Sequence, residues 1–86
     1  QKKIIIVSHY NAKINNEPIK SRLYLINLLE TICNKHHIRF VNPSMLLNNY
    51  TQTTILDRDL GHYTDFGLEI FNKHLDNIIE DVKVHD

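Results

Sequence analysis

The pattern of apolar and polar residues in the first half of the chain predicts two strands separated by a helix. β-Branched residues crowd the segment Lys3–Val7, and such a run favours a strand that is buried on both faces. A second short apolar segment predicts a strand over Ile38–Val41. Between them, apolar residues recur at spacings of three and four and predict a helix over about Pro18–Lys35, where Pro18 suits the first turn. These helical positions are Leu23, Ile26, Leu29, Ile32 and Cys33.

The second half of the chain contains one strong helical pattern. Apolar residues at spacings of four, three and four predict an amphipathic helix from Asp65 to about Lys83. Thr64 is a natural N-cap, and the carboxylate of Asp65 suits the positive end of a helix. Ser44 is a candidate cap for a short helical turn, whereas Asn48–Thr54 is expected to be an exposed loop. The apolar positions of the long helix are Phe71, Leu75, Ile78 and Val82.

The order strand, helix, strand, helix predicts an α/β fold. A helical crossover makes its two strands parallel, and two parallel strands form only a partial sheet, because such sheets need cover on both faces. A chain of 86 residues has room for one small domain. We therefore interpret residues 1–86 as a single small α/β segment of a larger domain. A missing upstream segment or a homo-oligomer would complete its sheet.

The composition of the chain argues against several classes of partner and cofactor. The formal net charge is zero, which gives no bulk attraction to nucleic acid or to a membrane surface. No apolar run is long enough to span a bilayer. The six histidines show no zinc-ligand spacing, and the adjacent His36 and His37 suit the end of a helix. We expect no metal and no cofactor, and we expect Cys33 to be a buried apolar residue.

The segment before the long helix carries the candidate chemistry. Asp59 and His62 are three residues apart, and Gly61 between them is expected to allow a tight turn. In such a turn the Asp59 carboxylate would hold one ring nitrogen of His62 and leave the other free to act as a base. Asp57 is a rival carboxylate whose spacing fits less well. The alternative is a helix-entry turn with a local hydrogen bond and no catalytic role.

The polar segment 8–17 follows the first strand and carries candidate substrate-binding residues. In an open parallel sheet, ligands bind beyond the carboxyl ends of the strands. Ser8, His9 and Asn11 are therefore expected to line a site at that edge. Ser8 follows a strand as a nucleophilic serine often does, but it has no small neighbour that would allow an exposed turn. An ordinary polar loop is the alternative.

The segment Asp59-Leu60-Gly61-His62, followed by Tyr63-Thr64-Asp65-Phe66-Gly67, resembles the last conserved block of the SGNH/GDSL hydrolase family. The resemblance implies that the chain is the second half of a flavodoxin-like SGNH hydrolase domain. It also implies that His62 and Asp59 supply two members of a Ser-His-Asp triad. The Gly-Asp-Ser motif that carries the nucleophile in that family does not occur in these 86 residues.

The function that follows from the resemblance is hydrolysis of a small-molecule or carbohydrate ester. A serine would attack the carbonyl carbon, His62 would act as general base, and Asp59 would orient His62. Two alternatives stay open at this point. One is an acyltransferase that modifies a polysaccharide on the same fold. The other is a non-catalytic α/β interaction module, in which Asp59 and His62 are structural residues.

Overall fold

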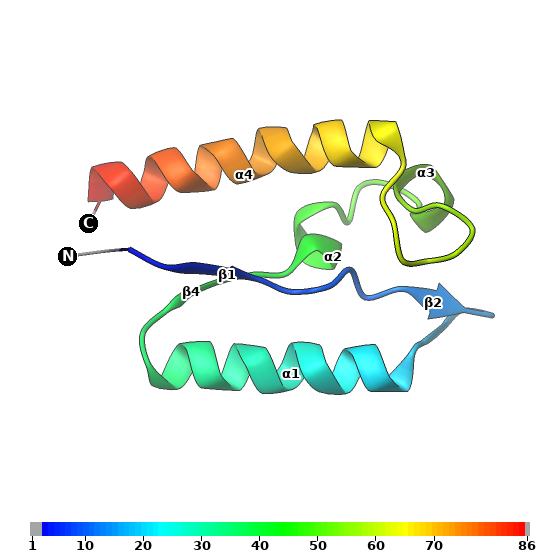
Figure 1. Ribbon diagram of the computed structural model, residues 1–86, viewed down its shortest axis with the longest axis horizontal. Helices are drawn as coiled ribbons and strands as arrows, with labels where there is room; N and C mark the ends of the chain where they lie inside the picture. Colours follow the sequence, from blue (N-terminus) through cyan, green and yellow to red (C-terminus); the bar gives the residue numbers. More distant parts are fainter. Residues whose placement is uncertain (1–2, 86) are drawn as a thin grey trace. The chain divides into compact units, whose positions relative to one another are not determined.

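The computed structural model describes residues 3–85 and shows a small α/β protein (Figure 1). The described residues form one parallel and one antiparallel two-stranded sheet, together with four helices. The chain divides into two compact units, one ending at Leu46 and the other beginning at Leu47. The α/β composition expected from the sequence is confirmed.

Two parallel strands, β1 (Ile5–Val7) and β4 (Arg39–Val41), form the main sheet of the first unit. Ile6 lies opposite Phe40, and the pairing continues one residue further where the Ser8 N–H donates to the Val41 carbonyl over 3.0 Å. The predicted strand–helix–strand order with parallel pairing is therefore confirmed, although both strands are shorter than expected.

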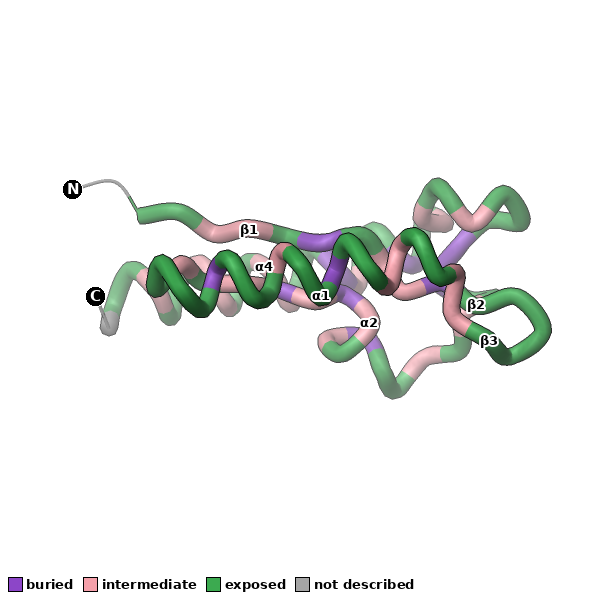
Figure 2. The backbone as a smooth tube through the Cα atoms, turned by 90° about the horizontal axis from the view of Figure 1, so that it is seen from below, coloured by how far each residue is buried: buried purple, intermediate pink, exposed green. Residues whose placement is uncertain are grey.

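Helix α1 (Lys20–Lys35) is the crossover between these strands and packs against β4. Its buried side chains are Ile26 and Cys33, which recur along one side of the helix (Figure 2). The burial expected for Cys33 is confirmed. Ile32, which the apolar pattern also assigned to this stripe, is 44% exposed, because it lies about 100° around the helix from Cys33.

The end of α1 returns the chain to the sheet through a tight cap. His37 adopts a left-handed backbone conformation with a φ of 56°. The Ile38 N–H donates to the Cys33 carbonyl over 2.8 Å, and the His37 N–H donates to the Asn34 carbonyl over 3.4 Å. These two bonds define a Schellman motif, in which glycine usually takes the left-handed position. The cap satisfies two helix-end carbonyls and leads directly into β4.

A small hairpin lies between β1 and α1 and includes the end of the polar segment 8–17. Strands β2 (Lys13–Ile14) and β3 (Glu17–Pro18) pair in antiparallel fashion. The two turn residues, Asn15 and Asn16, have φ values of 52° and 66°. Positive φ at both central positions is typical of a type I′ hairpin turn, and asparagine tolerates that conformation better than most residues. Pro18 thus ends a strand, and the prediction that it opens the helix is wrong.

Helix α2 (Pro43–Leu46) is a single turn that follows β4. The Ser44 N–H donates to the Asn42 side-chain oxygen over 3.0 Å. Asn42 therefore caps this turn and Pro43 occupies its first position, where the missing N–H is no loss. The predicted short helix is confirmed, but its cap is Asn42 and not Ser44.

The second unit contains helix α3 (Gln52–Ile55) and helix α4 (Asp65–His85), which contact each other. The loop expected over Asn48–Thr54 is wrong in its second half, where α3 begins. The predicted long helix is confirmed, and Phe71 on its apolar stripe is 8% exposed. Ile55 is fully buried.

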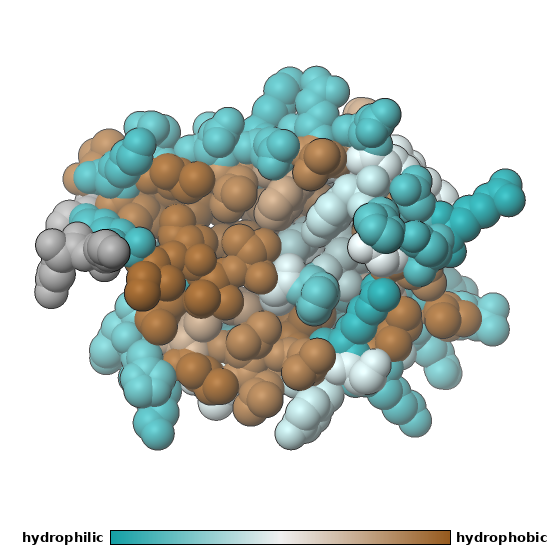
Figure 3. Space-filling view, viewed as in Figure 1, coloured by the Kyte–Doolittle hydropathy of each residue, from teal (hydrophilic) through white to brown (hydrophobic). Residues whose placement is uncertain are grey.

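Apolar surface remains uncovered on the strand β1. Ile4, just before the strand, is 57% exposed and Val7 is 39% exposed. Figure 3 shows hydrophobic surface over β1. Within the described residues, the sheet has only two strands, so each of them has one edge without a strand partner. None of the described helices combines the length and the apolar character needed to cross a membrane.

Candidate functional site

The segment between α3 and α4 forms a closed loop with a short antiparallel neck. The Asp57 N–H donates to the His62 carbonyl over 2.9 Å, and Leu56 forms an isolated bridge with Tyr63. Inside the loop, the Leu60 N–H donates to the Asp57 carbonyl over 3.0 Å. These backbone bonds fix the path of residues 57–62, so the positions of their side chains are set by local structure.

Asp59 and His62 form a hydrogen-bonded pair within this loop. The His62 Nδ1 atom lies 2.7 Å from the Asp59 Oδ2 atom. The other carboxylate oxygen of Asp59, Oδ1, accepts from the backbone N–H groups of Gly61 and His62 over 2.9 and 3.2 Å. One carboxylate therefore holds both the turn and the imidazole ring. The predicted contact between these two side chains is confirmed.

The turn is achieved differently from the sequence-based expectation. Leu60 is the residue with a left-handed backbone, at a φ of 59°, whereas Gly61 has no positive φ. A Cβ added at Gly61 would meet nothing closer than 3.9 Å. The role expected for Gly61 as the residue that permits the turn is therefore wrong. The three hydrogen bonds accepted by Asp59 offset the strain at Leu60, since a left-handed conformation costs a non-glycine residue roughly 1–2 kcal/mol.

Thr64 anchors the end of the loop to α3 and opens α4. Its N–H donates to the Ile55 carbonyl over 2.9 Å, and its hydroxyl lies 2.7 Å from the Thr54 carbonyl oxygen. The Gly67 N–H donates to the Thr64 Oγ1 atom over 2.9 Å. This is the bond from an N-cap residue to the third helical residue, so the predicted cap is confirmed.

Gly67 is required at its position by a close approach of two backbones. A Cβ at Gly67 would lie 2.3 Å from the Ile55 carbonyl oxygen, which is far inside ordinary contact. The first turn of α4 can therefore lie against the end of α3 only with glycine there. Two aromatic pairs hold the same region: Tyr63 stacks on Phe71, and Tyr50 meets Phe66 edge to face.

The charge state of the pair follows from these contacts. The hydrogen bond from the Gly61 N–H and that from the His62 ring hold the pKa of the Asp59 carboxyl below its usual value. The hydrogen bond to Asp59 and the negative charge of that residue raise the pKa of the His62 imidazole above its usual 6.5, and the charge of Asp57 adds to this effect. Asp59 is therefore ionised wherever His62 titrates.

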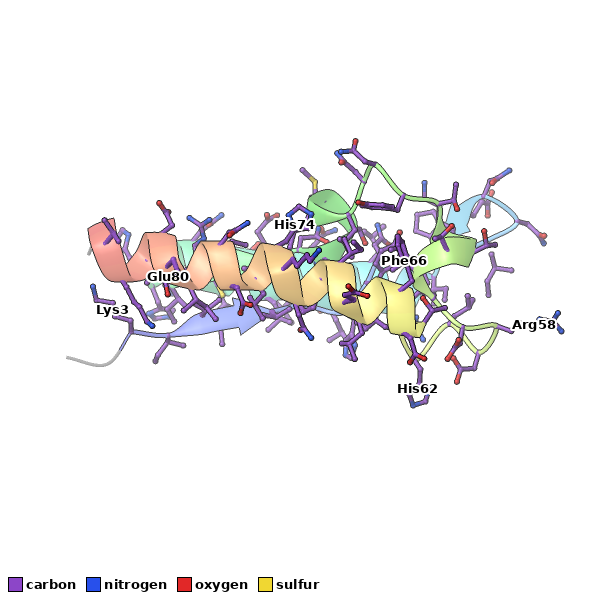
Figure 4. The ribbon with its side chains drawn as sticks, turned by 90° about the horizontal axis from the view of Figure 1, so that it is seen from above. Lys3, Arg58, His62, Phe66, His74 and Glu80 are labelled. Carbon is purple, nitrogen blue, oxygen red and sulfur yellow. The ribbon has the colours of Figure 1, made fainter. Side chains whose placement is uncertain are left out.

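The pair is open to solvent. The His62 side chain is 78% exposed and the Asp59 side chain is 55% exposed. Figure 4 shows His62 projecting outward beside the start of α4. Because Asp59 can only accept a hydrogen bond when ionised, neutral His62 carries its proton on Nδ1. The Nε2 atom then presents a lone pair to solvent, which allows it to take a proton from a hydroxyl group.

A hollow of about 210 Å³ opens in the same unit, beside the loop. Leu56 and Leu60 provide apolar lining, and Asp57 and Arg58 come from the loop itself. Gln52 and Thr53 of α3 complete the lining. The hollow therefore combines apolar contact with charged and neutral hydrogen-bonding groups.

The substrate-binding residues predicted from the sequence lie in the first unit. Ser8 is buried, and its hydroxyl donates to the His9 carbonyl over 3.1 Å. His9 is exposed, and the Asn11 N–H donates to the Ser44 hydroxyl. The Asn11 Oδ1 atom is buried without a hydrogen-bond partner among the described residues. The structure thus joins Asn11 to Ser44 near the carboxyl ends of the strands, while a substrate role for Ser8, His9 and Asn11 stays a prediction.

Comparison with protein families shows to which family the chain belongs. A family model described as the TviD N-terminal domain matches residues 1–77. The chain belongs to this family. Comparison of the chain with curated proteins and with solved structures gives no match.

The family match corrects the interpretation based on the Asp-x-x-His segment. The TviD N-terminal domain accounts for nearly the whole chain, so the chain is not an SGNH/GDSL hydrolase segment, and its assignment as a serine hydrolase or esterase is wrong. The spacing Asp59-x-x-His62 misled because the hydrogen bonds of a local turn are enough to bring these two side chains together. The geometry that the spacing predicted is correct, but the spacing does not specify a family.

Two residues that shape this TviD N-terminal domain were not predicted from the sequence to have a role. Leu60 takes the left-handed position, for which leucine gives no sequence signal. Arg58 lines the hollow, and the alternating charges of Asp57-Arg58-Asp59 were the available indication. Within residues 3–85, no group of three or more His, Cys, Asp or Glu side chains is arranged as metal ligands.

Proposed function

We propose that the Asp59–His62 pair acts as a general base in the transfer of an acyl group to a sugar hydroxyl of a polysaccharide. The 2.7 Å contact between His62 Nδ1 and Asp59 Oδ2 carries the proposal, since it leaves Nε2 available for proton transfer. The TviD N-terminal domain is associated with Vi capsular polysaccharide biosynthesis. This association supports a carbohydrate acceptor.

The proposed step needs one proton transfer in each direction. The acceptor hydroxyl gives its proton to His62 Nε2 as its oxygen attacks the acyl carbon of an ester or thioester donor. The bond from the acyl carbon to the donor's oxygen or sulfur then breaks, and His62 returns the proton to that leaving atom. Asp59 stabilises the imidazolium that exists between these two events.

The exposure of the pair indicates which groups must come from elsewhere. Acyl transfer requires hydrogen-bond donors for the developing oxyanion and a site that excludes water. The His62 side chain is 78% exposed. We infer that the acyl donor and the oxyanion-binding groups are supplied by another part of the protein or by a partner chain, which covers the pair during the reaction.

The sheet of the first unit is also proposed to be completed by further residues or by a second chain. Two parallel strands make a marginal sheet on their own, and the apolar residues Ile4, just before β1, and Val7, within it, remain exposed. We infer that β1 and β4 belong to a larger parallel sheet, which residues outside this segment or a second copy would complete.

A second candidate function is a non-catalytic interaction module. The observation that favours it is the structural use of Asp59, whose Oδ1 atom accepts two backbone N–H groups of the turn. In this case His62 would only complete the turn, and the exposed apolar residues Tyr24, Leu25 and Leu28 on α1 would be available for contact with a partner.

The experiment that separates these functions measures ester formation on the polysaccharide by the intact protein that carries the domain. His62→Ala should lower the rate by about 10²–10⁴-fold, the usual contribution of a positioned general base. His36→Ala is the matched control, because it removes an exposed histidine from the other unit. An undiminished rate in His62→Ala would reject the proposed function and favour the interaction module.

A further inference from the structure

The hollow and the Asp59–His62 pair share the Asp57–His62 loop. Asp57 and Arg58 line the hollow, and Asp59 follows them directly in the chain. The Asp57 backbone is hydrogen-bonded to the His62 carbonyl. One hydrogen-bonded loop therefore carries both the pair and part of the lining of the hollow.

The lining of the hollow has the chemistry of a sugar-binding site. Leu56 and Leu60 offer apolar contact to the C–H face of a sugar ring. The Asp57 carboxylate can accept hydrogen bonds from ring hydroxyls, and the Arg58 guanidinium can donate to hydroxyl or carboxylate oxygens. No ion pair to Arg58 is present among the described residues, so its guanidinium is available to a ligand.

The size and the lining of the hollow indicate which part of a polymer it would hold. At about 210 Å³ it is smaller than the roughly 300–1,000 Å³ of sites for drug-sized ligands, so it suits one ring and not an oligosaccharide. Arg58 projects from the loop in a different direction from His62 (Figure 4). The residues that line the hollow do not include Asp59 or His62, so a ring bound there would not be the group that reacts.

We propose that this hollow binds one glycosyl unit of the acceptor polysaccharide, next to the unit whose hydroxyl meets His62. The inference rests on the proposed function for the identity of the acceptor. Its consequence is that Arg58 and Asp57 are positioning residues. They hold the polymer in register, and neither of them gives or takes the transferred proton.

Titration of the ¹⁵N-labelled chain with an oligosaccharide tests the inference. The probe is a fragment of Vi capsular polysaccharide, prepared by partial hydrolysis and freed of esters with mild alkali. The amide signals of residues 52–60 should shift in a saturable manner. Arg58→Ala should weaken binding about tenfold, because one lost hydrogen bond to a charged group is commonly worth that factor or more. Asp57→Ala should also weaken it.

Two control variants make the outcome decisive. Lys73→Ala, which removes an exposed cation from α4, should bind as the unchanged chain does. His62→Ala should retain binding even though it loses acyl transfer. If saturable shifts appear at residues 52–60 but acyl transfer is independent of His62, the hollow is a glycan site and only the proposed function is rejected. Unchanged affinity in Arg58→Ala, or shifts confined to other residues, would overturn the hollow as a glycan site.

Discussion

Replacing Gly67 by alanine tests the packing that positions the start of α4. The new Cβ would lie 2.3 Å from the Ile55 carbonyl oxygen and 3.0 Å from the Ile55 carbonyl carbon and Cα. Ordinary contact begins near 3.4 Å, so the first turn of α4 must move away from the end of α3 by about 1 Å. That movement also stretches the 2.9 Å bond from the Thr64 N–H to the Ile55 carbonyl.

The expected loss of stability is the difference between opposing effects. Overpacking of this kind costs about 1–3 kcal/mol, and a weakened backbone hydrogen bond adds about 0.5–1.5 kcal/mol. Alanine in place of glycine in a helix returns about 1 kcal/mol through helix propensity. The net prediction for Gly67→Ala is a destabilisation of about 2 kcal/mol. For a chain of this size that corresponds to a fall in Tm of about 10 °C.

Thermal and urea unfolding followed by circular dichroism measure this difference directly. Gly61→Ala is the matched control, because its Cβ would meet nothing nearer than 3.9 Å and its φ is not positive. The control should be neutral or more stable by about 0.4–1 kcal/mol, since alanine restricts the unfolded chain. Equal stability of the two variants would refute the close backbone approach at Gly67.

Three further outcomes are expected. In ¹⁵N NMR titrations, the pKa of His62 should lie above 6.5. The neutral imidazole should carry its proton on Nδ1, because Asp59 accepts that hydrogen bond. A dominant Nε2–H tautomer would contradict this geometry. Thr64→Ala should destabilise the chain by about 0.5–2 kcal/mol in urea unfolding, while Thr64→Ser, which keeps the capping hydroxyl, should cost much less. Asn15→Val should cost about 1–2 kcal/mol because of its φ of 52°, whereas Asn15→Gly, tested in the same way, should not.

The elements that the sequence predicts well are those with a long apolar period. Phe71, Leu75 and Ile78 recur over several turns, and a period of that length has no competing interpretation. The β2–β3 hairpin has strands of two residues, which are too short to show alternation. Its signal lies only in Asn15-Asn16, the pair that tolerates positive φ. The residue types at the turn therefore predict this hairpin, whereas the pattern of apolar residues does not.

The candidate site shows the same division between local and non-local information. The contact of Asp59 with His62 follows from sequence spacing, because both residues lie in one short loop. The need for glycine at position 67 depends on the Ile55 carbonyl, which is twelve residues away in the chain. The hollow likewise joins α3 to the loop. Such features arise from tertiary packing, and no short motif reports them.

The role of Asp59 and His62 in acyl transfer is tested most directly by the pH dependence of ester formation. The intact protein that carries the domain is compared with its Asp59→Asn variant, using the polysaccharide as acceptor. His62 is a base only when neutral, so the rate should rise with pH through a midpoint above 6.5, where Asp59 places the pKa of His62. Asp59→Asn should lower the rate by about 10²–10⁴-fold and move the midpoint down toward 6.5. Coincident rates and midpoints in the two proteins would contradict a catalytic pair.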